Sequence, residues 1–145
     1  MRIQNVMSEV TSTVAPGESL RHALLKMQFE ELDSLPVVFK GRLIGVLHRS
    51  DIVKVVGYEH PMMLEDERLF EPLVETMCPV PAVVCTQDPV SAAAMYMNVF
   101  ELSSVPVVDE AKQLVGLVTR GDVVTAAIPL LEEDERIEEL TRMAA

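Results

Sequence analysis

Apolar residues recur along the chain in two patterns that predict alternating helices and strands. A β-branched run at residues 10–14 indicates an extended segment. Short apolar runs at residues 35–39 and 43–47, separated by Lys40-Gly41-Arg42, predict a β-hairpin. A helix is expected over residues 50–56. Between the extended segment and the hairpin, four apolar residues with the i, i+3, i+4, i+7 spacing of an amphipathic helix are Leu20, Ala23, Leu24 and Met27.

The second half of the chain repeats this order at an offset of 70 or 71 residues. Pro36 of the first hairpin corresponds to Pro106, and residues 105–108 and 114–118 predict a second hairpin. A helix follows over residues 120–128. Such self-similarity is the signature of a duplicated structural unit. The second amphipathic face, with the spacing of the first, consists of Val90, Ala93, Ala94 and Met97.

The helix starts carry capping signals. Ser19 is predicted to cap the first helix, and Asp88, which precedes Pro89, is predicted to cap its counterpart in the second repeat. Each half is small for an independent core, so we expect the two halves to share one. The predicted division is a first repeat at 1–60, a connection at 61–75, a second repeat at 76–128 and an acidic amphipathic helix at 129–145.

Charge and composition narrow the classes of partner. The formal net charge of −11 repels polyanions, so we expect no binding to nucleic acid or to an acidic membrane. No apolar run reaches the length of a membrane helix and residues 1–10 do not resemble a signal peptide, which favours a cytoplasmic protein. Cys78 and Cys85 are too few for a disulfide framework and are expected to pack as small buried hydrophobes.

Two interpretations fit Thr119-Arg120-Gly121-Asp122, the junction between the predicted strand at 114–118 and the helix that follows it. A Thr followed three residues later by an acid is typical of a capping arrangement, which needs no ligand. A helix N-terminus also attracts anions, Arg120 adds positive charge, and Arg49 occupies the matching position in the first repeat. An aspartate one turn into the helix can accept two hydrogen bonds from vicinal hydroxyls, so the junction also suits a nucleoside phosphate.

The doubled order of helix, Ser-x-Pro-Val-Val hairpin, Gly-h-h-Thr-x-x-Asp junction (h, apolar) and helix resembles a tandem pair of CBS domains, named after cystathionine β-synthase. The resemblance covers about residues 1–128. It implies an α/β (α+β) fold of two β-α-β-β-α units related by pseudo-two-fold symmetry, with two clefts between the sheets. Family members commonly bind AMP, ADP, ATP, S-adenosylmethionine or NAD in these clefts.

The resemblance also implies roles for particular residues. The motif aspartate holds the ribose, the residues around the threonine contact phosphates, and the Ser-x-Pro residues and the segment before the first helix line the base pocket. His48 replaces the motif threonine in the first repeat, so we expect unequal sites, with the second junction better occupied. The residues carried over are Asp122, Thr119 and Arg120 for one cleft, Asp51, Arg49 and Ser50 for the other, and Ser104, Pro106, Ser34, Pro36 and Thr13 around the bases.

The predicted function is therefore an adenine-nucleotide-binding regulatory module that acts on a separate, unknown partner protein. It requires no cofactor, and its ligand is AMP, ADP or ATP, with S-adenosylmethionine or NAD as alternatives. We expect no enzymatic activity, because no Walker loop, nucleophile elbow or zinc-binding His pair occurs. A homodimer is expected, with Met95, Phe100 and the helix after Arg120 as candidate contacts. The alternatives are a structural dimerisation module with no ligand and a redox role for Cys85.

Overall fold

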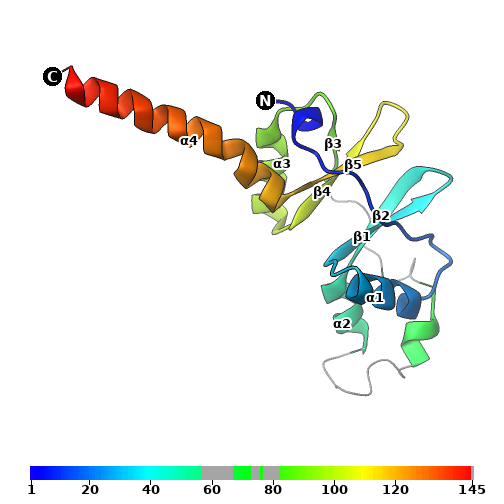
Figure 1. Cartoon of the computed structure of the whole chain (residues 1–145). Helices are drawn as coiled ribbons and strands as arrows, with labels where there is room; N and C mark the ends of the chain where they lie inside the picture. Colours follow the sequence, from blue (N-terminus) through cyan, green and yellow to red (C-terminus); the bar gives the residue numbers. More distant parts are fainter. Residues whose placement is uncertain (57–66, 73–75, 77–81, 145) are drawn as a thin grey trace.

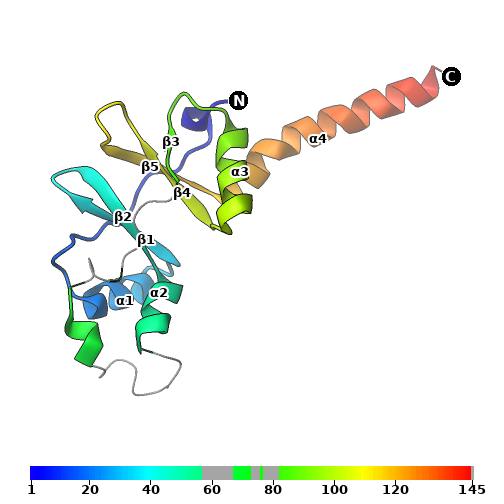
Figure 2. The ribbon, with the colours of Figure 1, turned by 180° about the vertical axis from the view of Figure 1, so that it is seen from behind.

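The computed structural model describes residues 1–56, 67–72, 76 and 82–144, and Figures 1 and 2 show it from opposite sides. The elements run in the order η1 (Ile3–Asn5), α1 (Leu20–Phe29), β1 (Ser34–Phe39), β2 (Arg42–His48), α2 (Arg49–Val56), η3 (Glu67–Phe70), β3 (Val84–Cys85), α3 (Val90–Phe100), β4 (Ser104–Val108), β5 (Leu114–Thr119) and α4 (Arg120–Met143). Most of the predicted connection and Cys78 lie outside the described residues.

The first repeat packs α1 and α2 against the antiparallel hairpin β1–β2. The helix α1 begins as predicted, because the Ser19 hydroxyl accepts a hydrogen bond from the His22 amide. The hairpin turns at Lys40 and Gly41, both of which have positive φ. The four predicted apolar residues of α1 are all buried, so the helical periodicity located this core correctly: Leu20, Ala23, Leu24 and Met27.

The second repeat forms a three-stranded sheet in the order β3-β4-β5, with β3 parallel to β4 and β5 antiparallel to it. The prediction that Asp88 caps α3 is wrong. Pro89 occupies the N-cap position, and the Asp88 carboxylate instead accepts a hydrogen bond from the Cys85 amide at 2.8 Å. Cys85 is exposed, so its predicted burial is also wrong.

The N-terminal segment belongs to both repeats. Ile3 is fully buried in the core of the second repeat, and Ser8 pairs with Leu117 of β5. The same segment then crosses to the first repeat, where Val14 is buried and bridges to Val37 of β1 (Figure 1). Along the sequence, the chain therefore contacts the second repeat before it forms the helices and strands of the first.

The hairpins also connect the repeats directly. The hydroxyls of Ser34 and Ser104, at the start of β1 and β4, lie within hydrogen-bond distance at 3.3 Å. Near the other ends, the Leu114 amide donates to the Gly41 carbonyl. Gly41 has a φ of 80°, which strains residues other than glycine, and a Cβ atom there would also displace the end of the flexible Gln113 side chain. The two repeats therefore share an interface along both hairpins. Each repeat nevertheless has its own cluster of buried apolar residues, so the expectation of one shared core is wrong for the described residues.

The helix α4 runs without interruption from Arg120 to Met143 and carries Pro129 inside it. The sequence predicted one helix ending near Ile128 and a separate C-terminal helix, whereas the structure joins them. Both views show the C-terminal part of α4 extending away from the two repeats (Figures 1 and 2). None of the helices in the described residues has the length and hydrophobicity that crossing a lipid bilayer requires.

Candidate functional site

The junction between β5 and α4 forms the predicted capping box. The Thr119 hydroxyl accepts a hydrogen bond from the Asp122 amide at 3.1 Å, and the Asp122 carboxylate accepts one from the Thr119 amide at 2.9 Å. These bonds satisfy two backbone donors that a helix N-terminus leaves without intrahelical partners. The same carboxylate also accepts from the Ser8 hydroxyl, at 3.0 and 3.1 Å to its two oxygens. Asp122 therefore already binds a hydroxyl group of the chain.

The junction between β2 and α2 reproduces half of this arrangement. The His48 amide donates to the Asp51 carboxylate at 3.0 Å, which matches the Thr119 amide and Asp122. His48 has an imidazole where Thr119 has its hydroxyl, so the two junctions differ chemically. The sequence alone shows this difference. That the two sites bind ligand unequally stays a prediction.

Arg49 and Arg120 occupy equivalent positions and make equivalent contacts. Arg49 donates through Nη2 to the Leu32 carbonyl at 3.1 Å, and Arg120 donates through Nε to the Leu102 carbonyl at 2.9 Å. Leu32 and Leu102 follow α1 and α3, respectively, and are 70 residues apart. Each arginine therefore binds a carbonyl just beyond the helix that precedes its own hairpin. Among the residues that the structure describes, the buried Nε of Arg49 has no hydrogen-bond partner.

Both arginines line one cleft between the repeats, with a volume of about 810 Å³. The cleft lies where the N-termini of α2 and α4 approach the C-terminal end of α3. Arginine and lysine side chains bring positive charge to it, and two carboxylates oppose them in part. The lining residues are Asp33, His48, Arg49, Ser50, Val53, Lys54, Phe100, Glu101, Leu102, Ser103 and Arg120.

The structure brings Arg49, Ser50 and Arg120 together at this cleft, whereas the sequence assigned them to two clefts. Asp51, Thr119 and Asp122 do not line it. Ser34 and Ser104 meet each other across the repeats, and Pro36 and Pro106 are buried in β1 and β4. The roles assigned to these residues remain predictions.

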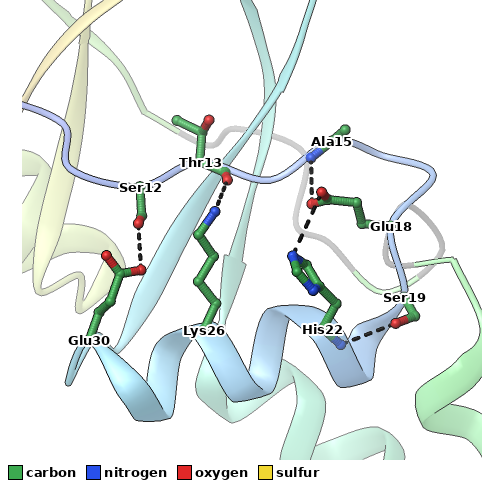
Figure 3. Close-up of polar contacts among 8 residues, drawn as sticks. All are labelled: Ser12, Thr13, Ala15, Glu18, Ser19, His22, Lys26 and Glu30. Carbon is green, nitrogen blue, oxygen red and sulfur yellow. Dashed lines mark hydrogen bonds and ion pairs between the residues drawn. The ribbon is translucent and has the colours of Figure 1, made fainter.

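Thr13 lies on the segment that precedes α1. Figure 3 shows this segment held along the helix, with the Lys26 ammonium donating to the Thr13 carbonyl at 2.8 Å. The side chain of Thr13 points away from α1 in this view. Further contacts tie Ser12 to Glu30 and the Ala15 amide to Glu18. Thr13 therefore has a fixed backbone and a side chain directed away from these contacts.

Sequence reasoning missed several cleft residues, of which Asp33, Lys54 and Glu101 are charged. Glu101 follows α3 in the left-handed conformation at φ 54°, and Glu31, 70 residues earlier, has φ 55°. Non-glycine residues adopt this conformation at a cost, and such positions cluster at functional sites. The repeat offset is the signal that could have found this loop, because Asp33 and Ser103 are also 70 residues apart and both line the cleft.

Metal binding is not indicated by the geometry that can be described. Among residues 1–56, 67–72, 76 and 82–144, no group of three or more His, Cys, Asp or Glu side chains is arranged to hold a metal ion. The cleft combines carboxylates with arginines, and the arginines are suited to an anionic ligand.

The family model for the CBS domain matches residues 3–58 and residues 73–129. The chain belongs to the CBS domain family. The two matches coincide with the two repeats, and the observed fold, with its hairpins, helices and duplicated junctions, is that of a CBS pair. The resemblance drawn from the two junction motifs is thereby confirmed.

Solved CBS pairs have the same architecture. CBSX2 from Arabidopsis thaliana is 25% identical with a TM-score of 0.79, and the match covers 90% of this chain and 96% of that one. A crystal structure of CBSX2 in complex with AMP matches with 26% identity and a TM-score of 0.75, over 89% of this chain and 97% of that one.

A curated relative places the same pair within a longer protein. A homoserine O-acetyltransferase from Methanococcoides burtonii is 32% identical over 122 residues, which cover 83% of this chain. The chain spans 23% of the length of that relative, so the match concerns a minor part of the longer protein.

Proposed function

We propose that this CBS pair binds an adenine nucleotide and, through that binding, regulates a separate partner protein. The observation that carries the proposal is the convergence of Arg49 and Arg120, from equivalent helix starts in the two repeats, on one cleft. Arginine recognises phosphate through several fixed donors, and helix N-termini favour anions. The AMP complex of the similar protein CBSX2 supports an adenosine ligand.

In this proposal the arginines and Ser50 bind the phosphates, and Lys54 adds positive charge. Asp122 and Asp51 are proposed to bind ribose hydroxyls and Thr119 a phosphate. None of the three lines the cleft, so these roles require a ligand that reaches beyond the cleft to the junctions. The residues proposed to lie around the bases are Ser104, Pro106, Ser34, Pro36 and Thr13. AMP, ADP or ATP is the proposed ligand, and S-adenosylmethionine and NAD are the alternatives. A ribose at Asp122 would exchange places with the Ser8 hydroxyl, which binds both carboxylate oxygens.

The regulatory step follows from the position of the cleft. Residues of both repeats line it, so a bound ligand contacts both and favours the arrangement in which the contacts are simultaneous. A ligand shifts an equilibrium only by its differential affinity for the two states. A partner that binds one arrangement better would then respond to the nucleotide.

Isothermal titration calorimetry with AMP, ATP and S-adenosylmethionine tests the proposal. We expect saturable heat with at least one nucleotide, and an affinity loss of at least tenfold in Arg49→Gln and Arg120→Gln. Arg21→Gln is the matched control, because Arg21 is exposed on α1 and does not line the cleft. Circular dichroism and the thermal midpoint of each variant separate a binding defect from unfolding. Binding that is unchanged in both cleft variants would contradict the assigned site.

A second candidate is a structural dimerisation module that binds no ligand. The same contacts favour it, because the capping box and the two arginine–carbonyl bonds account for Thr119, Asp122, Arg49 and Arg120 without any nucleotide. Absence of heat and of any thermal shift with AMP, ADP, ATP, S-adenosylmethionine and NAD would exclude the first candidate and leave this one.

We further propose a cytoplasmic homodimer. Large apolar side chains are exposed at equivalent positions of α1 and α3, 70 residues apart. Leu25 and Met95 are 38% and 53% exposed, and Phe29 and Val99 are 90% and 66% exposed. Leu25 and Phe29 lie one helical turn apart on α1, and Met95 and Val99 lie one helical turn apart on α3. Exposed apolar side chains at repeated positions are suited to an interface built on the symmetry of the pair.

A further inference from the structure

We propose that the C-terminal arm of α4, residues 134–143, is a docking helix for a basic amphipathic helix of a partner protein. The proposal concerns a surface outside the cleft and does not depend on nucleotide binding. Every side chain of the arm is exposed, and both views show this end of α4 extending beyond the two repeats (Figures 1 and 2). The described parts of the two repeats therefore leave it uncovered.

The arm carries an apolar stripe. Ile137 and Leu140 are 54% and 60% exposed, and with Ala144 they have the i, i+3, i+7 spacing of one helix face. Leu130 precedes Ile137 by seven residues, so the sequence continues the same heptad spacing. A repeat of this kind is typical of the seam of a helix–helix contact. The stripe is the apolar half of a docking surface.

The charge around the stripe identifies the occupant. Six acidic residues lie between Glu132 and Glu139, against one arginine in that span, Arg136. Asp134 and Glu138, one turn apart, lie beside Ile137 on the same flank. A second copy of the chain would bring the same acidic excess against this flank. Anionic lipid headgroups would likewise be repelled, whereas a partner helix with Lys or Arg beside its apolar face is complementary.

The helix itself is poorly supported in isolation. Pro129 lacks the amide that an interior helical position donates, so the arm is joined to the body through a weakened turn. The part of α4 beyond Pro129 is of a length at which single helices in water are marginal. A helical partner would supply the missing packing, so docking should order the arm as well as cover it.

The test uses the full chain and a defined probe. The probe is a fluorescein-labelled helical peptide of three heptads, with Leu at the a and d positions and Lys at e and g. Its control has Glu at e and g. We expect fluorescence anisotropy to show saturable binding of the Lys peptide at physiological salt and none of the Glu peptide. Hydrogen exchange of the amides of residues 134–143 should slow when the Lys peptide binds.

Variants locate the contact. Ile137→Gln with Leu140→Gln removes the apolar stripe while keeping good helix formers, and should weaken binding at least tenfold. Asp134→Asn with Glu138→Gln should weaken binding severalfold and reduce its dependence on salt. Glu135→Gln, on the opposite side of the helix from the stripe, is the matched control and should change affinity less than twofold.

Three results would overturn the proposal. The first is no binding of the Lys peptide at concentrations up to about 100 μM, an affinity weaker than most specific complexes. The second is binding of the Lys peptide to the Ile137→Gln/Leu140→Gln variant with the same affinity as to the unmodified chain. The peptide would then be held by net charge alone, without the apolar stripe. The third is slow hydrogen exchange of the arm without peptide, combined with self-association of the chain, when the Ile137→Gln/Leu140→Gln variant loses both. This result would identify a second copy of the chain as the occupant.

Discussion

At the scale of single residues, the Thr119–Asp122 pair has a structural role that can be measured without any ligand. Thr119→Ala removes the acceptor of the Asp122 amide at the start of α4. The free energy of unfolding should fall by about 1 kcal/mol, the usual effect of losing such a cap. Urea denaturation followed by circular dichroism measures it. Thr119→Ser keeps the hydroxyl and should lose less, and equal losses in the two variants would contradict the capping role.

Ser8 provides a test that depends on the proposed ribose contact. If a nucleotide ribose replaces the Ser8 hydroxyl on Asp122, Ser8→Ala removes a competitor for the carboxylate. Affinity for the nucleotide should then rise by about three- to tenfold, or about 0.6–1.4 kcal/mol. Calorimetry measures the change, and Ser12→Ala, at a serine that contacts Glu30 instead, is the control. Weaker binding in Ser8→Ala would mean that Ser8 positions Asp122 for the ligand.

The sequence predicted the local part of this site and missed its distant partners. Thr119 and Asp122 are three residues apart, so a local pattern specifies their contact. Ser8 reaches Asp122 from 114 residues away, and no local pattern encodes that distance. Glu101 and Lys54 carry no motif at all and line the cleft because of how the repeats pack.

At the scale of elements, Pro129 divides α4 into a packed part and an exposed arm. Pro129→Ala restores an interior amide and removes the ring clash with the preceding turn, effects worth up to about 3 kcal/mol in a helix interior. We expect slower hydrogen exchange of the amides of residues 134–143. The urea midpoint should move little, because the arm is exposed and contributes little to the core. Unchanged exchange in the arm would show that Pro129 does not limit its stability.

The helices and hairpins were predictable because their signals are local and occur twice. The start of α3 shows where such reasoning fails. The side-chain chemistry of Asp88 favours it as the cap, yet Pro89 is the residue 70 positions after Ser19, which caps α1. The Val90 amide donates to the Met1 carbonyl, so the N-terminal segment satisfies this helix start in place of a side-chain cap. The repeat offset was the better guide.

At the scale of the molecule, the proposed homodimer should depend on Phe29 and Val99. Phe29→Asp with Val99→Asp places charges on the exposed apolar positions of α1 and α3. Sedimentation equilibrium should give twice 16.1 kDa for the unmodified chain and 16.1 kDa for the variant. Ile137→Gln with Leu140→Gln is the control and should remain dimeric. A dimeric Phe29→Asp/Val99→Asp variant would exclude these helices as the interface.

Salt should strengthen the same dimer. Each chain has a formal net charge of −11, so two copies repel one another over distances comparable with the Debye length. Raising the salt concentration from about 50 mM to about 500 mM shortens that length severalfold, and the dissociation constant should fall. A dimer that weakens with salt would instead depend on ion pairs across the interface.

The N-terminal segment, which packs against both repeats, affects when the protein can finish folding during synthesis. Ile3 is synthesised well before its core partners in β3 to β5, which follow about 80 to 115 residues later. Until these strands are made, Ile3 has no core to pack into, and the first repeat emerges while the segment that precedes it lacks its contacts with the second repeat. We infer that the pair completes folding only after β5 has been synthesised. An isolated second repeat would correspondingly lack a buried side chain of its own core.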